Sequence, residues 1–166
     1  MSADIPVLRL DRLTTLAAHL DAVPADRFYL GTWFANRIPT DEELHHSEYL
    51  PDSPDFQPYD CGTVGCAIGH ACWIPEFQAA GLRTSESRGA PEYQTPGGLL
   101  YQHWEAVFAF FGLNEEQGLH LFSESKYPGR GRTTPARVAK RIRQFVRDNS
   151  PPDRGTLTVL PGGNPA

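Results

Sequence analysis

All three cysteines of the chain lie within one short segment, together with a histidine that could share a metal ion with them. Cys66 and His70 are four residues apart, so on a helix they would lie on the same face and could bind one ion together. Cys61 could add a third ligand from the preceding loop, and His45 or His46 a fourth. Two thiolates and two imidazoles form a set that zinc favours, although Cys-x4-Cys-x3-His is not the spacing of a standard zinc knuckle or ribbon.

The same segment also has a purely structural interpretation. Residues 61–74 contain no Asp, Glu, Lys or Arg. Free cysteine is among the most buried residue types, and a histidine close to Trp73 can simply hydrogen bond to a carbonyl group. We therefore predict that Cys66 and Cys72 are buried and unmodified. We expect no cofactor, and a zinc site remains the alternative.

Cys61 is also a candidate nucleophile, because it directly precedes a predicted helix whose free N–H groups and dipole would stabilise a thiolate. The sequence Tyr59-Asp60-Cys61-Gly62 resembles the start of the catalytic helix in cysteine hydrolases of the NlpC/P60 type, where the motif is Asp-Cys-Ser-Gly; the serine is missing here. The resemblance implies that Cys61 attacks and that a histidine acts as base. His103 is the downstream candidate, but that family holds its base on a strand, and residues 102–105 have the pattern of a helix.

Hydrophobic spacing predicts the elements that would position these residues. Apolar residues recur at helical intervals over 9–22, 101–111, 115–122 and 135–148. A further helix is predicted over 64–74, with Thr63 as its N-cap and Pro75 as its end. Because it has no charged side chain, this helix should be buried on all sides. Gly65 and Gly69 would leave a flat strip on it, where another backbone can approach closely.

The sequence therefore predicts a mainly α protein, a single compact helical domain around the central helix 64–74, with long Pro- and Gly-rich loops. The loops cover 36–60 and 82–98, and one short strand or hairpin is expected near 27–34. Residues 1–150 are predicted to form the domain and 151–166 a Pro- and Gly-rich C-terminal tail. At 166 residues the chain is long enough to bury a hydrophobic core. The predicted core residues are Val64, Ile68, Trp73, Trp104, Phe108, Phe111, Val138, Ile142 and Phe145.

The net charge of −5 is unevenly distributed along the chain. Residues 1–60 hold eleven acidic and four basic residues, whereas residues 126–147 hold eight basic residues and no acidic one. A concentrated basic face of this kind is a candidate for binding another copy's acidic 36–60 loop or a nucleic acid, and the alternative is a plain solvated face. The side chains predicted to form this face of the last helix are Arg137, Lys140, Arg141, Arg143 and Arg147.

The sequence predicts neither membrane insertion nor export. No apolar stretch approaches the roughly twenty residues that a membrane span needs. The N-terminal sequence has no basic region followed by a long apolar one, as a signal peptide would. Three cysteines without an export signal predict reduced thiols and a cytoplasmic location.

The order of motifs along roughly residues 8–148 resembles that of small uncharacterised proteins from bacterial and phage genomes. The shared features are a Phe-x-x-x-Thr-Trp-like segment at 28–33, the motif Cys-Gly-Thr-x-x-Cys-x-x-Gly-x-Ala at 61–71, Phe-Phe-Gly-Leu at 110–113, Leu-Phe at 121–122 and a helix that starts with Thr-Pro at 134–135. The resemblance implies no activity, but it implies a phage or mobile-element origin and hence a cytoplasmic or virion location.

We therefore predict a non-catalytic accessory or assembly protein of phage or bacterial origin, which acts through a protein partner or through self-assembly. Nucleic-acid binding through the basic helix is a further possibility, and no membrane partner is expected. Two alternatives stay open: a zinc-stabilised interaction module, and a cysteine-dependent hydrolase that uses Cys61.

Overall fold

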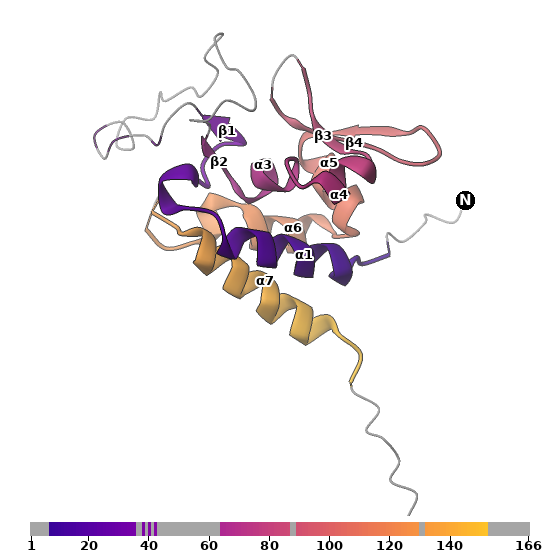
Figure 1. Cartoon of the computed structure of the whole chain (residues 1–166). Coiled ribbons are helices and arrows are strands. Elements are labelled where there is room, and N and C mark those ends of the chain that lie inside the picture. Colours follow the sequence, from indigo (N-terminus) through magenta and orange to yellow (C-terminus); the bar gives the residue numbers. More distant parts are fainter. Residues whose placement is uncertain are drawn as a thin grey trace, which may run out of the picture.

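The computed structural model describes residues 7–35, 38, 40, 42, 64–86, 89–129 and 132–152. Cys61, His45, His46 and the predicted N-cap Thr63 lie outside these residues, as does the tail from residue 153 onward. The described part is a mixed α/β structure, in which helices pack beside a three-stranded antiparallel sheet (Figure 1). The prediction of a mainly α fold is therefore wrong.

Two strands of the sheet lie in segment 82–98, which was expected to be a loop, and the third overlaps the start of the predicted helix 101–111. The strands are β3 (Leu82–Thr84), β4 (Pro91–Gln94) and β5 (Leu100–Gln102), in the order β3-β4-β5. Tyr93 lies in the middle of the sheet, opposite Leu82 on one side and Tyr101 on the other. Strands of three or four residues are too short to give a clear alternating pattern, and the surrounding Gly, Pro and Ser residues concealed them. Pro91 is tolerated because it is the first residue of its strand.

The predicted central helix 64–74 is wrong in its extent, because only residues 67–71 of the segment form a helix. β2 (Val64–Gly65) pairs antiparallel with β1 (Phe34–Ala35), and two short helices follow, α3 (Ala67–Ala71) and α4 (Pro75–Ala79). The Cys66 N–H donates to the Trp33 carbonyl at 3.2 Å, which keeps the backbone extended up to the start of α3. Pro75 begins the second helix, since a proline is favourable in the first turn.

The region near 27–34 is largely irregular, but its last residue is part of the expected strand. A 3-10 turn, η1, covers Ala25–Arg27, and β1 begins at Phe34. Between them, Phe28 forms an isolated parallel bridge with Gly65. The segment therefore packs along the start of the cysteine region.

Four other predicted helices are confirmed, with small changes at their ends. They are α1 (Leu10–Asp21), α5 (His103–Phe111), α6 (Glu115–Phe122) and α7 (Pro135–Asn149). A second 3-10 turn, η2 (Glu124–Lys126), follows α6. The end signals are local: Asn114 and Gln117 form a capping box, and Thr134 accepts a hydrogen bond from the Arg137 N–H. Gly112 ends α5 with a left-handed φ of 66°.

The sheet lies at one end of the molecule, against α4 and α5, and α1 and α7 pack side by side at the other end (Figure 1). Most of the predicted core residues occupy one large cluster, in which Ile68, Phe111, Val138 and Ile142 are buried. Val64 is buried instead in a small second cluster with Tyr29. Four further predicted core residues are only half-buried and pack against the main cluster: Trp73, Trp104, Phe108 and Phe145.

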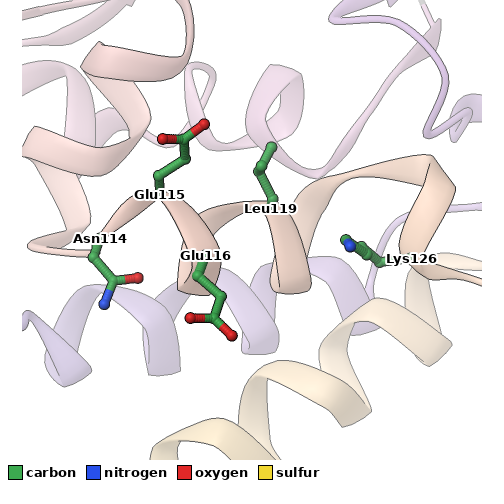
Figure 2. A pocket seen from close by; sticks show the side chains of 5 residues that line it. All are labelled: Asn114, Glu115, Glu116, Leu119 and Lys126. Atoms are coloured by element: carbon green, nitrogen blue, oxygen red, sulfur yellow. The ribbon is translucent and has the colours of Figure 1, made fainter.

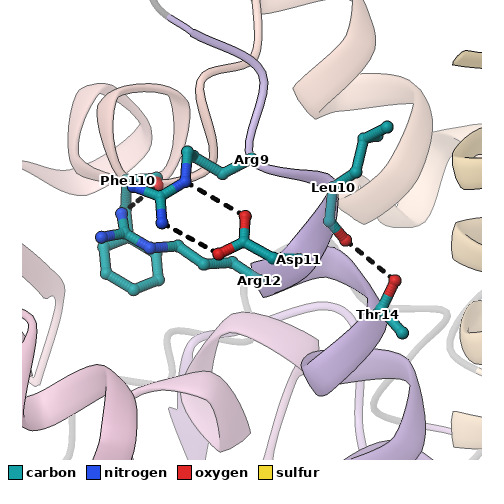
Figure 3. Close-up of polar contacts among 6 residues, drawn as sticks. All are labelled: Arg9, Leu10, Asp11, Arg12, Thr14 and Phe110. Atoms are coloured by element: carbon teal, nitrogen blue, oxygen red, sulfur yellow. Dashed lines mark hydrogen bonds and ion pairs between the residues drawn. The ribbon is translucent and has the colours of Figure 1, made fainter. Parts of the chain in front are cut away.

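Polar contacts join the start of α1 to the end of α5 (Figure 3). The Arg12 guanidinium donates to the Phe110 carbonyl at 2.6 Å and also lies 4.0 Å from the centre of the Phe110 ring. Beside it, Arg9 binds both carboxylate oxygens of Asp11, at 3.1 and 2.9 Å. These contacts fix the N-terminal end of α1 on the core. Among the described residues, no helix has both the length and the apolar character needed to cross a membrane.

Candidate functional site

Cys66 is used as the N-cap of α3. Its Sγ accepts a hydrogen bond from the Gly69 N–H at 3.4 Å, and its side chain is 3% exposed. Burial raises the pKa of the Cys66 thiol to about 11. At neutral pH the group is therefore a protonated, enclosed thiol that caps a helix.

Cys72 lies at the end of α3 and is also buried. Its thiol lies 3.6 Å from the Arg83 carbonyl oxygen, to which it can donate a hydrogen bond. Burial raises the pKa of this thiol as well. A buried thiol with a raised pKa is a poor nucleophile and a poor metal ligand, since both roles require the thiolate. The prediction that Cys66 and Cys72 are buried free cysteines is confirmed.

His70 lies between α3 and the segment that leads into β1. Its Nε2 is 2.9 Å from the Arg27 carbonyl oxygen, so this nitrogen donates a hydrogen bond, because a carbonyl oxygen only accepts. Aromatic side chains surround the ring: Trp73 packs edge-on at 5.0 Å between ring centres, with Phe28 at 6.2 Å and His19 at 5.9 Å. Burial lowers the pKa of His70 to about 4, and the pKa of the half-buried His19 is lowered for the same reason. The imidazole is therefore neutral at physiological pH.

The proposed zinc ligands are only partly within the described structure. Cys66 and His70 lie on or next to α3, and each already has a backbone partner. Across the described ranges, no three His, Cys, Asp or Glu side chains are grouped as a metal site would require. Cys61, His45 and His46 lie outside the described residues, so a zinc site that includes them stays a prediction.

His103, the candidate base, is exposed and is the first residue of α5. It directly follows β5, which differs from the expectation that residues 102–105 are all helical. Its φ is 55°, a left-handed value that costs a residue other than glycine about 1–2 kcal/mol. Its partner in the proposed hydrolase, Cys61, lies outside the described residues, so the pair stays a prediction.

A shallow pocket of about 480 Å³ lies at the start of α6. Figure 2 shows Glu115 and Glu116 projecting from the first turn of α6, with Leu119 one turn further along and Lys126 at the other side. The two carboxylates lie at the positive end of the helix dipole, which stabilises them without any ligand. The sequence pattern did not predict this pocket.

The most exposed apolar group of the sheet is the tip of the β4–β5 hairpin, which extends from the body of the molecule (Figure 1). Residues 96–100 are exposed without interruption, and among them Leu99 is 63% and Leu100 50% exposed. The turn is well defined, because the Thr95 N–H donates to the Leu99 carbonyl at 2.9 Å and the Gly98 N–H to the Thr95 carbonyl at 2.9 Å. Sequence analysis missed this tip because it treated 82–98 as a loop.

The basic helix α7 presents only part of its predicted basic face to solvent. Arg143 forms an ion pair with Asp21 of α1. Arg141 donates to the carbonyls of His120 and Lys126, both at 2.9 Å, and lies over the Tyr127 ring. Arg141 and Arg143 lie on the outer side of α7 but are engaged by neighbouring elements. The exposed cations of α7 are Arg137, Lys140 and Arg147.

Comparisons with protein-family models, with curated proteins and with solved structures found no match to this chain.

Proposed function

We propose that this protein is a non-catalytic accessory or assembly protein that acts through protein–protein contacts. A phage or bacterial origin, with a cytoplasmic or virion location, belongs to the same proposal through the resemblance of its motifs. The observation that carries the proposal is the ordered apolar tip of the β4–β5 hairpin, where the consecutive residues Leu99 and Leu100 are both exposed.

The hairpin holds this tip in place by packing on its buried face. Tyr93 of β4 is buried and packs edge-on against Phe110 of α5, with 5.2 Å between ring centres. It also stacks on Tyr101 of β5 at 6.4 Å. A partner would therefore meet a preorganised surface, which reduces the entropy cost of binding.

The energy available at the tip is appropriate for a contact site. Full burial of an exposed leucine side chain contributes about 1.5–3 kcal/mol, and since Leu99 is 63% and Leu100 50% exposed, the two together would contribute about 2–3 kcal/mol to binding. The edge strand β5, with Leu100, Tyr101 and Gln102, also carries no charged residue. Charged residues and prolines on an edge strand discourage pairing with other chains, so their absence from β5 favours a contact at this edge.

The chemistry of the described polar groups supports a role without catalysis. The thiols of Cys66 and Cys72 are buried and protonated, and the donor nitrogen of His70 is engaged by a carbonyl. Each group has a structural role, as a helix cap or as a link between segments.

Site-specific photo-crosslinking in the native host tests the proposal. A photoreactive residue at position 99 should give a discrete protein adduct, and the matched control at the exposed position Ala18 on α1 should not. The double variant Leu99→Ser/Leu100→Ser should fold normally and lose the partner that the crosslink identifies. Equal labelling at positions 99 and 18, or retention of the partner by the double variant, would contradict the proposal.

A further inference from the structure

Strand β5 lies at an edge of the three-stranded sheet, in the hairpin that extends from the body (Figure 1). Within the described chain, no strand pairs with β5 on the side away from β4. The Thr95 N–H donates to the Leu99 carbonyl, so the backbone groups of Leu99 face β4. Gln94, opposite Leu100 in the register, donates instead to the Gly81 carbonyl on the β3 side. Because backbone direction alternates along a strand, the N–H and C=O of Leu100 point away from β4.

This edge is free of charge, unlike the opposite edge of the sheet. Strand β3 contacts α4 and carries Arg83, whereas residues 95–102 contain no Asp, Glu, Lys or Arg. Charged side chains on an edge strand discourage pairing with another chain, and like charges placed directly opposite each other are destabilising. Two copies of a chain with a net charge of −5 can therefore approach at β5 without placing like charges across the contact.

The side chains of this edge complement those of an identical edge. In a two-fold antiparallel pair with Leu100 on the axis, Leu100 lies opposite its own counterpart, and Leu99 lies opposite Tyr101. Each exposed apolar residue of the tip then meets an apolar residue. With Tyr101 on the axis, Leu100 would lie opposite Gln102, and with Leu99 on the axis it would lie opposite Gly98. The first register is therefore favoured, and its match requires the same sequence on both sides of the axis.

The structure limits how far such a pairing can extend. His103 has a φ of 55°, which turns the chain out of the strand directly after Gln102. At the other end, the Gly98 N–H donates to the Thr95 carbonyl within the turn. Pairing is therefore limited to about residues 98–102, and a contact of this length belongs to the small, transient class of interfaces. We expect association at high protein concentration.

We propose that β5 pairs antiparallel with β5 of a second copy of this chain, with Leu100 on the two-fold axis, so that one continuous sheet spans both copies. The N–H and C=O of Leu100 then bond to the same groups of its counterpart. This inference rests on the function proposed above, because it uses the hairpin tip as the contact site and names the partner. The contact uses the same edge of both copies, so it closes at a dimer.

Substitutions at position 100 test both the contact and its symmetry. Leu100→Lys would place two lysines opposite each other on the axis, and Leu100→Glu would place two glutamates there. In sedimentation velocity of the purified full chain, each variant alone should self-associate at least about tenfold more weakly than the wild type. An equimolar mixture should associate more strongly than either variant alone, because a lysine then faces a glutamate. This recovery requires position 100 to meet its own counterpart.

Gln94 offers a matched control, because it is exposed and lies opposite Leu100 on the neighbouring strand β4. In the paired dimer the two copies of residue 94 are three strand spacings apart, about 14 Å, which exceeds the Debye length of about 8 Å at physiological salt. Gln94→Lys should therefore associate as the wild type does. Circular dichroism should show that all the variants stay folded.

A proline at position 100 tests the backbone bond separately from the side chain. Leu100→Pro and Leu100→Ala both lack the leucine, but the proline also lacks the N–H that points away from β4. Proline is tolerated on an edge strand when its own sheet does not use the missing donor. The proline variant should therefore fold and associate more weakly than the alanine variant.

The inference is overturned if the wild type is monomeric at every concentration, or if Leu100→Lys associates as strongly as the wild type. It is also overturned if the mixture of Leu100→Lys and Leu100→Glu associates no better than its components. The proposed function survives these results if a photoreactive residue at position 99 still gives an adduct with a different host protein. The absence of any adduct from position 99 in the host would contradict the proposed function itself.

Discussion

The chemistry of His70 is determined by burial and by one backbone partner. Sequence alone placed it four residues after Cys66 and allowed two interpretations, as a zinc ligand or as a core histidine. In the structure its Nε2 donates a hydrogen bond to the Arg27 carbonyl, forty-three residues earlier in the chain. No local pattern predicts which distant carbonyl a histidine will meet, so this part of the site could not be derived from sequence. The burial of Cys66 and Cys72 could be derived, because their segment carries no charge.

Acidification should destabilise the protein through His70. Its pKa is lowered from 6.5 to about 4 by burial, so between these values the unfolded chain binds a proton that the folded chain does not. The stability that neutral His70 contributes is complete above pH 6.5 and is lost as the pH falls towards 4. The free energy of unfolding should therefore fall by about 2 kcal/mol between pH 7.5 and pH 5 from this group alone.

Urea unfolding of the wild type and of His70→Gln at both pH values measures this contribution. Glutamine keeps an N–H donor for the Arg27 carbonyl but does not titrate, so the variant should lose about 2 kcal/mol less than the wild type on acidification. The same pH dependence in both proteins would show that His70 is not the titrating group. The variant His19→Gln, measured in the same way, shows how much of the pH dependence comes from the neighbouring imidazole of His19.

At the scale of elements, short strands were harder to predict than helices. Hydrophobic spacing predicted α5, α6 and α7, whose ends carry local signals: the caps at Asn114 and Thr134 and the glycine at 112. Strand β2 is two residues long and depends on pairing with β1, thirty residues away along the chain. Helical periodicity extends through such a strand without interruption, so the sequence predicted one helix over 64–74, where a strand and one short helix occur.

Gly69 is required by the close approach of another backbone. A Cβ at this position would overlap the Trp33 carbonyl oxygen and lie 3.0 Å from the Phe34 ring. That oxygen is fixed, because it accepts a hydrogen bond from the Cys66 N–H. Gly69→Ala should therefore lower the free energy of unfolding by at least about 1 kcal/mol, since the cost of overpacking exceeds the gain in helix propensity.

Gly65→Ala is the matched control, because its Cβ would meet its nearest atoms at an ordinary 3.5 Å. Chemical denaturation of the two variants beside the wild type gives the comparison. A Gly69→Ala protein as stable as the wild type would mean that the β1 backbone can move away from α3.

Arg141 links three elements rather than extending into solvent. It joins α7 to the end of α6 and to η2 through two carbonyls, and its guanidinium lies 3.6 Å from the centre of the Tyr127 ring. The Tyr127 hydroxyl in turn donates to the Leu121 carbonyl at 2.6 Å. Helical periodicity placed Arg141 on the outer face correctly, but it could not reveal that neighbouring elements cover one edge of that face.

Arg141→Gln should lower the free energy of unfolding by about 1–3 kcal/mol, through the loss of charge-assisted hydrogen bonds and of the cation–π contact. Arg137→Gln removes the same charge from an exposed position of the same helix and should change stability by no more than about 0.5 kcal/mol. Urea denaturation at moderate salt compares them. Equal effects of the two substitutions would show that the contacts of Arg141 contribute nothing measurable.

At the scale of the whole molecule, one cluster of buried side chains includes residues from α1, the cysteine segment, the sheet, α5, α6 and α7. Its hydrophobic positions on the long helices were accessible from sequence, because a core-facing stripe recurs every three or four residues. The exposed tip at Leu99 could not be predicted from the sequence, because the exposure of a residue depends on which strands pair beneath it. The boundary between the domain and the tail at residue 150 stays a prediction.

Ile68 tests whether this cluster unfolds as one unit. It is 1% exposed and lies on α3, which contacts both α1 and β2. Ile68→Ala should lower the free energy of unfolding by about 2–5 kcal/mol, from lost burial and from the cavity that remains. Urea denaturation followed by tryptophan fluorescence and by far-UV circular dichroism should give the same reduced midpoint with an unchanged slope, because a shared core makes unfolding cooperative. Val7→Ala, at a side chain that is 78% exposed, should leave the midpoint almost unchanged. Two separate transitions, or a loss below about 1 kcal/mol for Ile68→Ala, would mean that α3 does not share the core of the long helices.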